Sequence, residues 1–115
     1  MTSRASIGDF VINQVPMATN QGFTNFECTE KVLNRFLLYS LRFNVPYIKR
    51  LASGSTFLEI SKRNVKALCI HLPDMNTQTK VVKELESVIN ENVAIQSQID
   101  NARTISREIL SQIFG

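Results

Sequence analysis

The sequence has little of what marks several common classes of protein. Its 115 residues include no tryptophan, one histidine and two cysteines, Cys28 and Cys69. Two cysteines cannot build the disulfide framework of a small secreted domain, which favours a reducing compartment. No apolar run is long enough to cross a bilayer, and no apolar stretch follows Arg4 as it would in a secretory signal. We therefore expect a cytoplasmic protein with no membrane partner.

Groups that perform catalysis or hold a cofactor are equally scarce. Cys69 and His71 would share one face of a strand, but two donors without a third ligand do not make a zinc site. His71 is therefore interpreted as a partly buried strand residue. Gly54-Ser55-Thr56 is too short for a phosphate-binding loop and lacks the lysine that such a loop needs. No spacing supports a nucleophilic role for Cys28. We predict no catalytic residue, no metal site and no cofactor.

The charge is unevenly divided along the chain. Residues 1–73 carry nine bases and four acids, a net charge of +5, whereas residues 74–115 carry four bases and six acids, a net charge of −2. Together they give the overall +3. A basic part followed by a slightly acidic part suggests one surface for a polyanion and another for protein. An uneven but purely solvated surface remains the alternative, because charge alone does not define a DNA site.

Residues 1–73 are predicted to form a small lobe of the α+β class, a mixed α/β lobe with several loops. Alternating apolar and polar residues predict strands at 7–15 and 23–28, and shorter ones at 57–60 and 70–72. The turn between the first two strands falls at 18–22, where small and polar residues gather.

Three short helices are predicted between these strands. Thr29 as N-cap and the apolar series after it predict a helix that reaches Phe43. Pro46 suits the first turn of a second helix that ends at Leu51. Ser61 suits the cap of a third that ends at Leu68.

Residues 74–115 follow a different pattern. No Gly or Pro occurs between Asp74 and Gly115, and Asn76 or Thr77 is the predicted N-cap. The predicted helix would be roughly 55 Å long. Ten positions recur at alternating spacings of four and three over about five heptads, which predicts a coiled-coil seam. We call these positions the pairing seam: Val81, Leu85, Val88, Asn92, Ile95, Ile99, Ala102, Ser106, Ile109 and Ile113.

A lobe of this size cannot cover so long an apolar stripe, so the helix needs another helix to pack against. The partner would be a second copy of the chain or a different subunit, and an amphipathic helix folded back on its own lobe is the alternative. Asn92 is a seam position where a buried amide would penalise slipped registers. Alternatively, Asn92 points to solvent at the edge of the seam.

Several stretches taken together resemble the specificity subunit of type I restriction–modification systems. These are Ser3-Arg4-Ala5-Ser6-Ile7-Gly8-Asp9, Ala18-Thr19-Asn20-Gln21-Gly22-Phe23, Leu51-Ala52-Ser53-Gly54-Ser55-Thr56-Phe57-Leu58-Glu59-Ile60-Ser61, Leu72-Pro73 and Gln78. No single stretch is diagnostic, but their order before a long helix is fairly specific, and the resemblance spans essentially the whole chain.

The resemblance implies a non-catalytic subunit whose target recognition domains read double-stranded DNA. In that family each such domain is followed by a long helix, two helices pair antiparallel as a spacer, and the subunit docks modification and restriction subunits. A full member has two domains and two helices, whereas this chain has at most one of each, and its motifs indicate a start inside the recognition domain. It differs from the family also at Thr77, where an acidic residue usually precedes the glutamine.

Expected DNA contacts follow from the same comparison and from the chemistry of the residues. Phosphates need exposed cations, and base edges need amides or hydroxyls. The predicted DNA-binding residues are Arg4, Asn20, Gln21, Lys49, Arg50, Ser55, Thr56, Lys62 and Arg63. Alternatively, Asn20 and Gln21 only stabilise the turn in which they lie, and Thr56 only caps a turn. Arg35 and Arg42 are expected on the outer face of the first helix.

Two functions remain open from the sequence. The first is a DNA-recognition fragment, residues 1–73 acting as a partial recognition lobe and residues 74–115 as a spacer and dimerisation helix, which forms an antiparallel homodimer. The second is a structural or regulatory fragment that binds no DNA and assembles with restriction–modification subunits through its helix. The sequence identifies neither the DNA target nor the direction of helix pairing.

Overall fold

The computed structural model describes residues 1–54 and 58–115, so Ser55, Thr56 and Phe57 lie outside the described residues. The chain divides into two compact units, Met1–Val82 and Lys83–Gly115. The sequence suggested a division at 73/74 instead, where the long helix begins, and that division remains a prediction.

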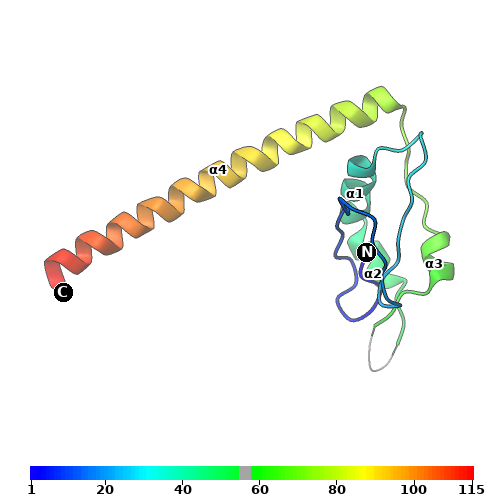
Figure 1. Cartoon of the computed structure of the whole chain (residues 1–115), viewed down its shortest axis with the longest axis horizontal. Helices are drawn as coiled ribbons and strands as arrows, with labels where there is room; N and C mark the ends of the chain where they lie inside the picture. The colour runs from blue at the N-terminus through cyan, green and yellow to red at the C-terminus, as the bar shows by residue number, and fades with distance from the viewer. Residues whose placement is uncertain (55–57) are drawn as a thin grey trace. The chain divides into compact units, whose positions relative to one another are not determined.

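The described residues contain four helices, in the order drawn in Figure 1. They are α1 (Asn34–Phe43), α2 (Val45–Arg50), α3 (Lys62–Lys66) and α4 (Met75–Phe114). Each lies where the sequence predicted a helix, although α1 begins later than expected and α3 ends earlier. None of these helices combines the length and the apolar character needed to cross a membrane.

The prediction of a lobe with strands was wrong for the described residues. Only isolated bridges occur there, between Thr2 and Phe23, between Arg4 and Glu59, and between Ser53 and Glu59. A strand requires several successive residue pairs along one partner, and each of these contacts stops after a single pair. The described part of the chain is therefore helical, with extended segments that touch without forming a sheet.

The segments at 7–15, 23–28 and 70–72, and the described residues of 57–60, thus form no strand. Burial along 7–15 follows the alternation only in part, since Phe10 is 6% exposed and Val11 is 81% exposed, but Ile7, three positions before Phe10, is buried as well. A pattern of apolar and polar residues does not determine whether a neighbouring segment pairs with the backbone. In this segment Asn13 Nδ2 instead donates locally to the carbonyl of Val15 at 2.9 Å, and Pro16 has no N–H to offer a ladder.

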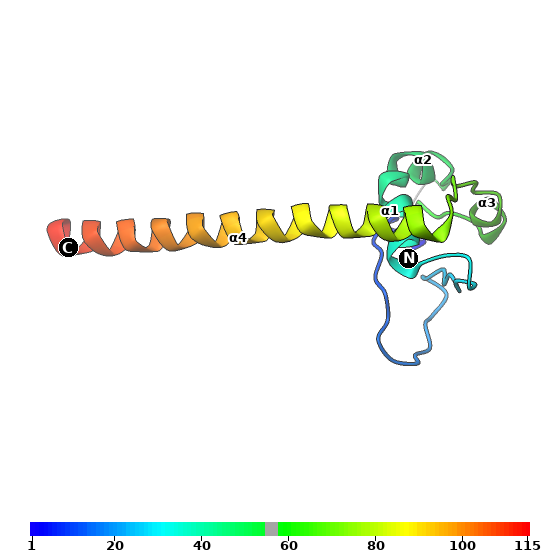
Figure 2. The same ribbon diagram turned by 90° about the horizontal axis from the view of Figure 1, so that it is seen from above.

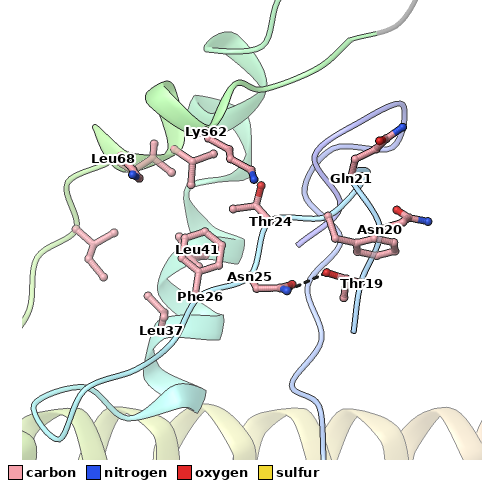
Figure 3. Close-up of a pocket in the computed structure, with 14 residues that line it drawn as sticks. Thr19, Asn20, Gln21, Thr24, Asn25, Phe26, Leu37, Leu41, Lys62 and Leu68 are labelled. Carbon is pink, nitrogen blue, oxygen red and sulfur yellow. Dashed lines mark hydrogen bonds between the residues drawn. The ribbon is translucent and has the colours of Figure 1, made fainter. Parts of the chain in front are cut away.

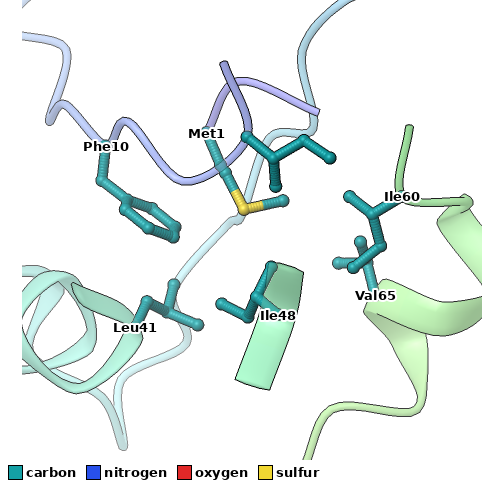
Figure 4. Packing of buried hydrophobic residues seen from close by; sticks show 7 residues of the cluster. Met1, Phe10, Leu41, Ile48, Ile60 and Val65 are labelled. Atoms are coloured by element: carbon teal, nitrogen blue, oxygen red, sulfur yellow. The ribbon is translucent and has the colours of Figure 1, made fainter. Parts of the chain in front are cut away.

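The core of the first unit consists of side chains that come from segments far apart in sequence. Figure 4 labels six of these side chains. Its buried members are Met1, Ile7, Phe10, Leu41, Ile48, Ile60 and Val65. Ile48 of α2 is fully buried and Ile60 is 2% exposed, and burying an isoleucine contributes roughly 1.5–3 kcal/mol. The core thus ties α1, α2 and α3 to the amino-terminal segment.

Helix α1 begins at Asn34, so the prediction of Thr29 as its N-cap was wrong. The carbonyl of Thr29 accepts a hydrogen bond from Val32 N at 3.1 Å, which closes a turn before the helix. The actual N-cap is Leu33, which has no capping side chain of its own. Its N–H donates to Gln78 Oε1 at 2.9 Å, and a partner 45 residues away cannot be read from the local sequence.

Helix α3 starts as the sequence predicted, with Ser61 as N-cap. Ser61 Oγ accepts a hydrogen bond from Asn64 N at 3.1 Å, which satisfies one of the free N–H groups of the first turn. Asn64 Nδ2 in turn donates to the carbonyl of Leu51 at 2.9 Å, immediately after α2. This bond joins α3 to the carboxyl end of α2.

Helix α4 begins at Met75, and Asp74 rather than Asn76 or Thr77 caps it. Asp74 Oδ1 accepts hydrogen bonds from the N–H groups of Asn76 and Thr77, both at 3.0 Å. Asp74 Oδ2 accepts from the Thr77 hydroxyl at 2.7 Å. The hydroxyl of Thr77 and then its N–H lower the pKa of the Asp74 carboxyl, because these bonds favour the charged form.

The helix is continuous for 40 residues, which corresponds to about 60 Å of axis, and Figure 2 draws it unbroken. Its first turns belong to the first unit, where Gln78 is fully buried and Val82 is 8% exposed. From Lys83 onward all side chains are exposed except that of Glu86, which is half-buried.

Candidate nucleic-acid interface

A groove of about 830 Å³ lies on the first unit, between the segment at 19–26 and helices α1 and α3 (Figure 3). Its apolar lining consists of Phe23, Phe26, Leu37, Leu41, Val65, Leu68 and Ile70. Its polar lining consists of Thr19, Asn20, Gln21, Thr24, Asn25, Lys62 and Lys66. The groove therefore combines an apolar surface with amides, hydroxyls and two cations.

Internal hydrogen bonds hold the wall at 19–26 in shape. Asn20 Oδ1 accepts from Gly22 N at 2.9 Å, and Phe23 N donates to the Asn20 carbonyl at 3.2 Å. Asn25 Nδ2 donates to Thr19 Oγ1 at 2.8 Å, the dashed line in Figure 3. The wall is also tied to the amino-terminal segment, because Thr24 N donates to the Met1 carbonyl at 2.9 Å.

The opposite wall is supplied by α3. Lys62 and Lys66 are one helical turn apart and both exposed, while Val65 between them turns into the core. Figure 3 shows the Lys62 side chain extending toward Thr24. No Asp or Glu is among the described residues that line the groove. With two lysines and no acid, its electrostatic character favours an anionic ligand.

The groove brings together three of the nine residues predicted to contact DNA, namely Asn20, Gln21 and Lys62. The oxygen of Asn20 holds the turn, as one reading of the sequence expected. Arg63 is exposed on α3 but does not line the groove. Ser55 and Thr56 lie outside the described residues.

The three other predicted contacts lie elsewhere on the first unit. Lys49 and Arg50 are exposed in the last turn of α2, and the Arg50 guanidinium lies over the Tyr47 ring, 5.8 Å from its centroid. Arg4 pairs with Glu59 at 3.0 Å. The hydrogen bond from Asn64 to Leu51 keeps the end of α2 beside α3, so Lys49 and Arg50 belong to the same region as Lys62 and Arg63.

Sequence analysis missed four groove residues with chemistry of interest. Lys66 follows Lys62 by four positions, so the predicted helix at 61–68 already implied a shared face. Phe23 and Phe26, which are 39% and 37% exposed, had been assigned to a strand. Asn25 gave no signal, because its bond to Thr19 depends on the fold of the loop.

Arg35 and Arg42 were expected on the outer face of α1, and both are exposed. Arg42 Nη2 donates to the carbonyl of Phe10 at 3.2 Å, so its charge also holds the segment after Gly8 against α1. No group of three or more His, Cys, Asp or Glu suited to a metal ion occurs within 1–54 and 58–115.

Comparison with known proteins identifies the family. The model of the type I restriction modification DNA specificity domain matches residues 1–103. The chain belongs to this family. The resemblance to the specificity subunit of type I restriction–modification systems, which the sequence indicated, is thus confirmed.

Two relatives of this specificity domain come from Methanocaldococcus jannaschii. The type I restriction enzyme MjaIX specificity subunit is 34% identical over 87 residues, which are 74% of this chain and 20% of the relative. The protein described as the MjaX specificity subunit is 30% identical over 86 residues, with the same shares of each chain. The chain thus spans about a fifth of the length of these relatives. No solved structure matches the specificity domain of this chain.

Proposed function

We propose that this chain is a DNA-recognition fragment of a type I restriction–modification system, which binds duplex DNA through the basic first unit. The observation that carries the proposal is the groove beside α3, where two lysines lie beside amide side chains and no acid is among the described lining residues. Lysines contact phosphates, and amides such as those of Asn20 and Gln21 bind base edges.

The proposed phosphate contacts extend beyond the groove. Lys49 and Arg50 at the end of α2, with Lys62 and Arg63 at the start of α3, supply four exposed cations in one region. Arg4 is a further proposed contact, and its pairing with Glu59 means that DNA would compete with a carboxylate for it. Ser55 and Thr56 remain proposed contacts on the basis of the sequence.

The second part of the proposal concerns α4. The pairing seam forms one line along a helix whose apolar side chains stay exposed, including Val88 at 56% and Ile95 at 54%. Exposed apolar side chains in heptad order typically form the surface through which two helices pair. We infer an antiparallel homodimer through α4, with modification and restriction subunits as further partners.

Binding of fluorescent duplex DNA to the purified chain, measured at several salt concentrations, tests DNA recognition. We expect affinity to fall steeply with salt, and the double substitution Lys62→Gln and Lys66→Gln to reduce the slope of log K against log salt by about two. The control is Lys80→Gln with Lys83→Gln, an equal charge loss on α4. Absence of binding at low salt by a folded chain contradicts the proposal.

A second candidate function is a structural or regulatory fragment that binds no DNA and assembles with restriction–modification subunits through α4. The exposed seam suits pairing with an amphipathic helix of any partner. The chain also spans only about a fifth of the length of its relatives. Light scattering with and without a modification subunit separates the two functions. A monomer that becomes a stable complex only with that subunit supports the second function, and a dimer by itself supports the first.

A further inference from the structure

Gln78 has the most fully satisfied buried polar side chain in the described part of the chain. It is 0% exposed. Its Oε1 accepts from Leu33 N at 2.9 Å, and its Nε2 donates to the carbonyl of Lys31 at 2.9 Å and to that of Pro73 at 2.8 Å. One amide therefore joins the start of α4 to the segment before α1 and to the residue that precedes the Asp74 cap.

These three bonds need an amide of this length. Leu33 N–H belongs to the group of amides that a helix start leaves without an internal partner, so it requires an acceptor. The carbonyls of Lys31 and Pro73 require donors. A glutamate would supply only the acceptor at neutral pH, and a methionine of similar shape would supply neither. Asparagine would be one carbon too short to hold the same geometry.

The position of Gln78 in the heptad pattern connects these contacts with the pairing seam. Gln78 lies three residues before Val81 and seven before Leu85, so it continues the pairing seam toward the start of the helix. Along this one line, Gln78 is buried and Val81 is half-buried, whereas Leu85 is 39% exposed and Val88 is 56% exposed. This face of α4 contacts its own lobe at Gln78, and from Leu85 onward it is exposed and accessible to a partner helix.

We propose that Gln78 is a positioning residue that fixes the rotation of the first turns of α4, up to Val82, against the lobe that it contacts. Because the lobe already occupies the seam at Gln78, the seam offered to a partner helix begins after it. A rotation or slip of α4 by one residue would break all three hydrogen bonds and leave their buried groups unpaired. The inference rests on the proposed function only where it concerns the distance between two DNA half-targets.

Amide hydrogen exchange on the unmodified chain tests the contact without any substitution. The Leu33 amide is expected to exchange roughly tenfold or more slowly than an unprotected loop amide, although it precedes α1. Exchange of Leu33 at the unprotected rate in the folded chain overturns the proposal.

Spin-label distances between Lys49→Cys in α2 and Lys80→Cys in α4 test the positioning, in a background of Cys28→Ser and Cys69→Ser and diluted with unlabelled chain. We expect one narrow distance distribution for the parent and a broad one for Gln78→Met and for Gln78→Glu. Gln96→Met is the matched control, because Gln96 is an exposed glutamine of the same helix, and it should keep the narrow distribution. Equally narrow distributions for folded Gln78 variants overturn the proposal.

Selection of bound duplexes from a random pool connects the positioning to DNA. The parent dimer should enrich two half-targets with one fixed gap, whereas Gln78→Met should enrich the same half-targets with several gaps. A fixed gap in the Gln78→Met pool counts against the proposal. If the parent enriches no half-target, the proposed DNA recognition is contradicted. The exchange of the Leu33 amide and the label distances still decide the role of Gln78 in that case.

Discussion

Arg4 and Glu59, 55 residues apart, are joined through their side chains, and backbone hydrogen bonds between their neighbours hold the two residues opposite each other. The Arg4 Nη2 and Nε groups donate to Glu59 Oε2 at 3.0 and 3.3 Å, and the two residues also form an isolated antiparallel bridge. Both side chains remain nearly half exposed, at 47% and 44%. Water therefore screens the ion pair, which contributes little to stability, typically below about 1 kcal/mol.

Replacement of Glu59 should consequently affect DNA binding more than folding. Glu59→Gln removes a negative charge and releases the Arg4 guanidinium for a phosphate. We expect a several-fold gain in affinity for duplex DNA at low salt, and a change in unfolding free energy of no more than about 1 kcal/mol. Binding titration and urea denaturation measure the two quantities. Glu27→Gln, an equal charge change at an exposed site, is the control, and an unchanged or weaker affinity for Glu59→Gln argues against Arg4 as a contact.

The Asp74 cap predicts a specific response of α4 to acid. Hydrogen bonds from Thr77 and Asn76 lower the pKa of Asp74 in the folded chain below its value in the unfolded chain. The unfolded state then binds the proton more readily, so the contribution of Asp74 is present above its ordinary pKa and is lost as pH falls through the folded value. Thermal unfolding followed by circular dichroism should show this loss in the parent.

Asp74→Asn provides the comparison, because asparagine also caps helices but does not titrate. We expect its melting temperature to lie below that of the parent near neutral pH and to converge with it in acid. A constant difference between the two chains at all pH values would contradict the assigned pKa direction.

Local sequence signals predicted the helices better than the extended segments. Ser61 acts on Asn64, three residues away, and the heptad pattern of α4 needs no distant partner to be recognised. The start of α1, by contrast, depends on the bond between Leu33 and Gln78, which only the folded chain creates. Likewise, alternation along 7–15 predicted a strand but could not reveal that no second segment within 1–54 and 58–115 forms a ladder beside it.

The candidate site was predictable by residue type and not by arrangement. Asn20, Gln21 and Lys62 were identified individually from their chemistry and from the family resemblance. Their association with Phe23 and Lys66 in one groove arises from the packing of α3 against the core through Val65. Such a contact joins segments about 40 residues apart, and no local pattern in the sequence encodes it.

Gly8 should be difficult to replace, for reasons of both backbone and space. Its φ is +101°, a region that side chains rarely adopt, and a Cβ added there would lie 2.9 Å from Val45 Cγ1. We expect Gly8→Ala to lower the unfolding free energy by roughly 1–3 kcal/mol, measured by urea denaturation. The double variant with Val45→Ala removes the clash and retains the strained φ. Partial recovery in the double variant is expected, whereas a Gly8→Ala chain as stable as the parent contradicts this account.

Helix pairing makes the most direct prediction for α4. Ile95 and Ile99 are adjacent seam positions, 54% and 42% exposed in the single chain. If a second helix covers the seam, Ile95→Asp with Ile99→Asp would bury two unpaired carboxylates, each at a cost of several kcal/mol. We expect the dissociation constant of the dimer to rise by at least roughly 100-fold in sedimentation experiments. Ser97→Asp, on the opposite face of the same turn, should leave the dimer intact. A dimer unaffected by the double substitution would show that the seam is not the pairing surface.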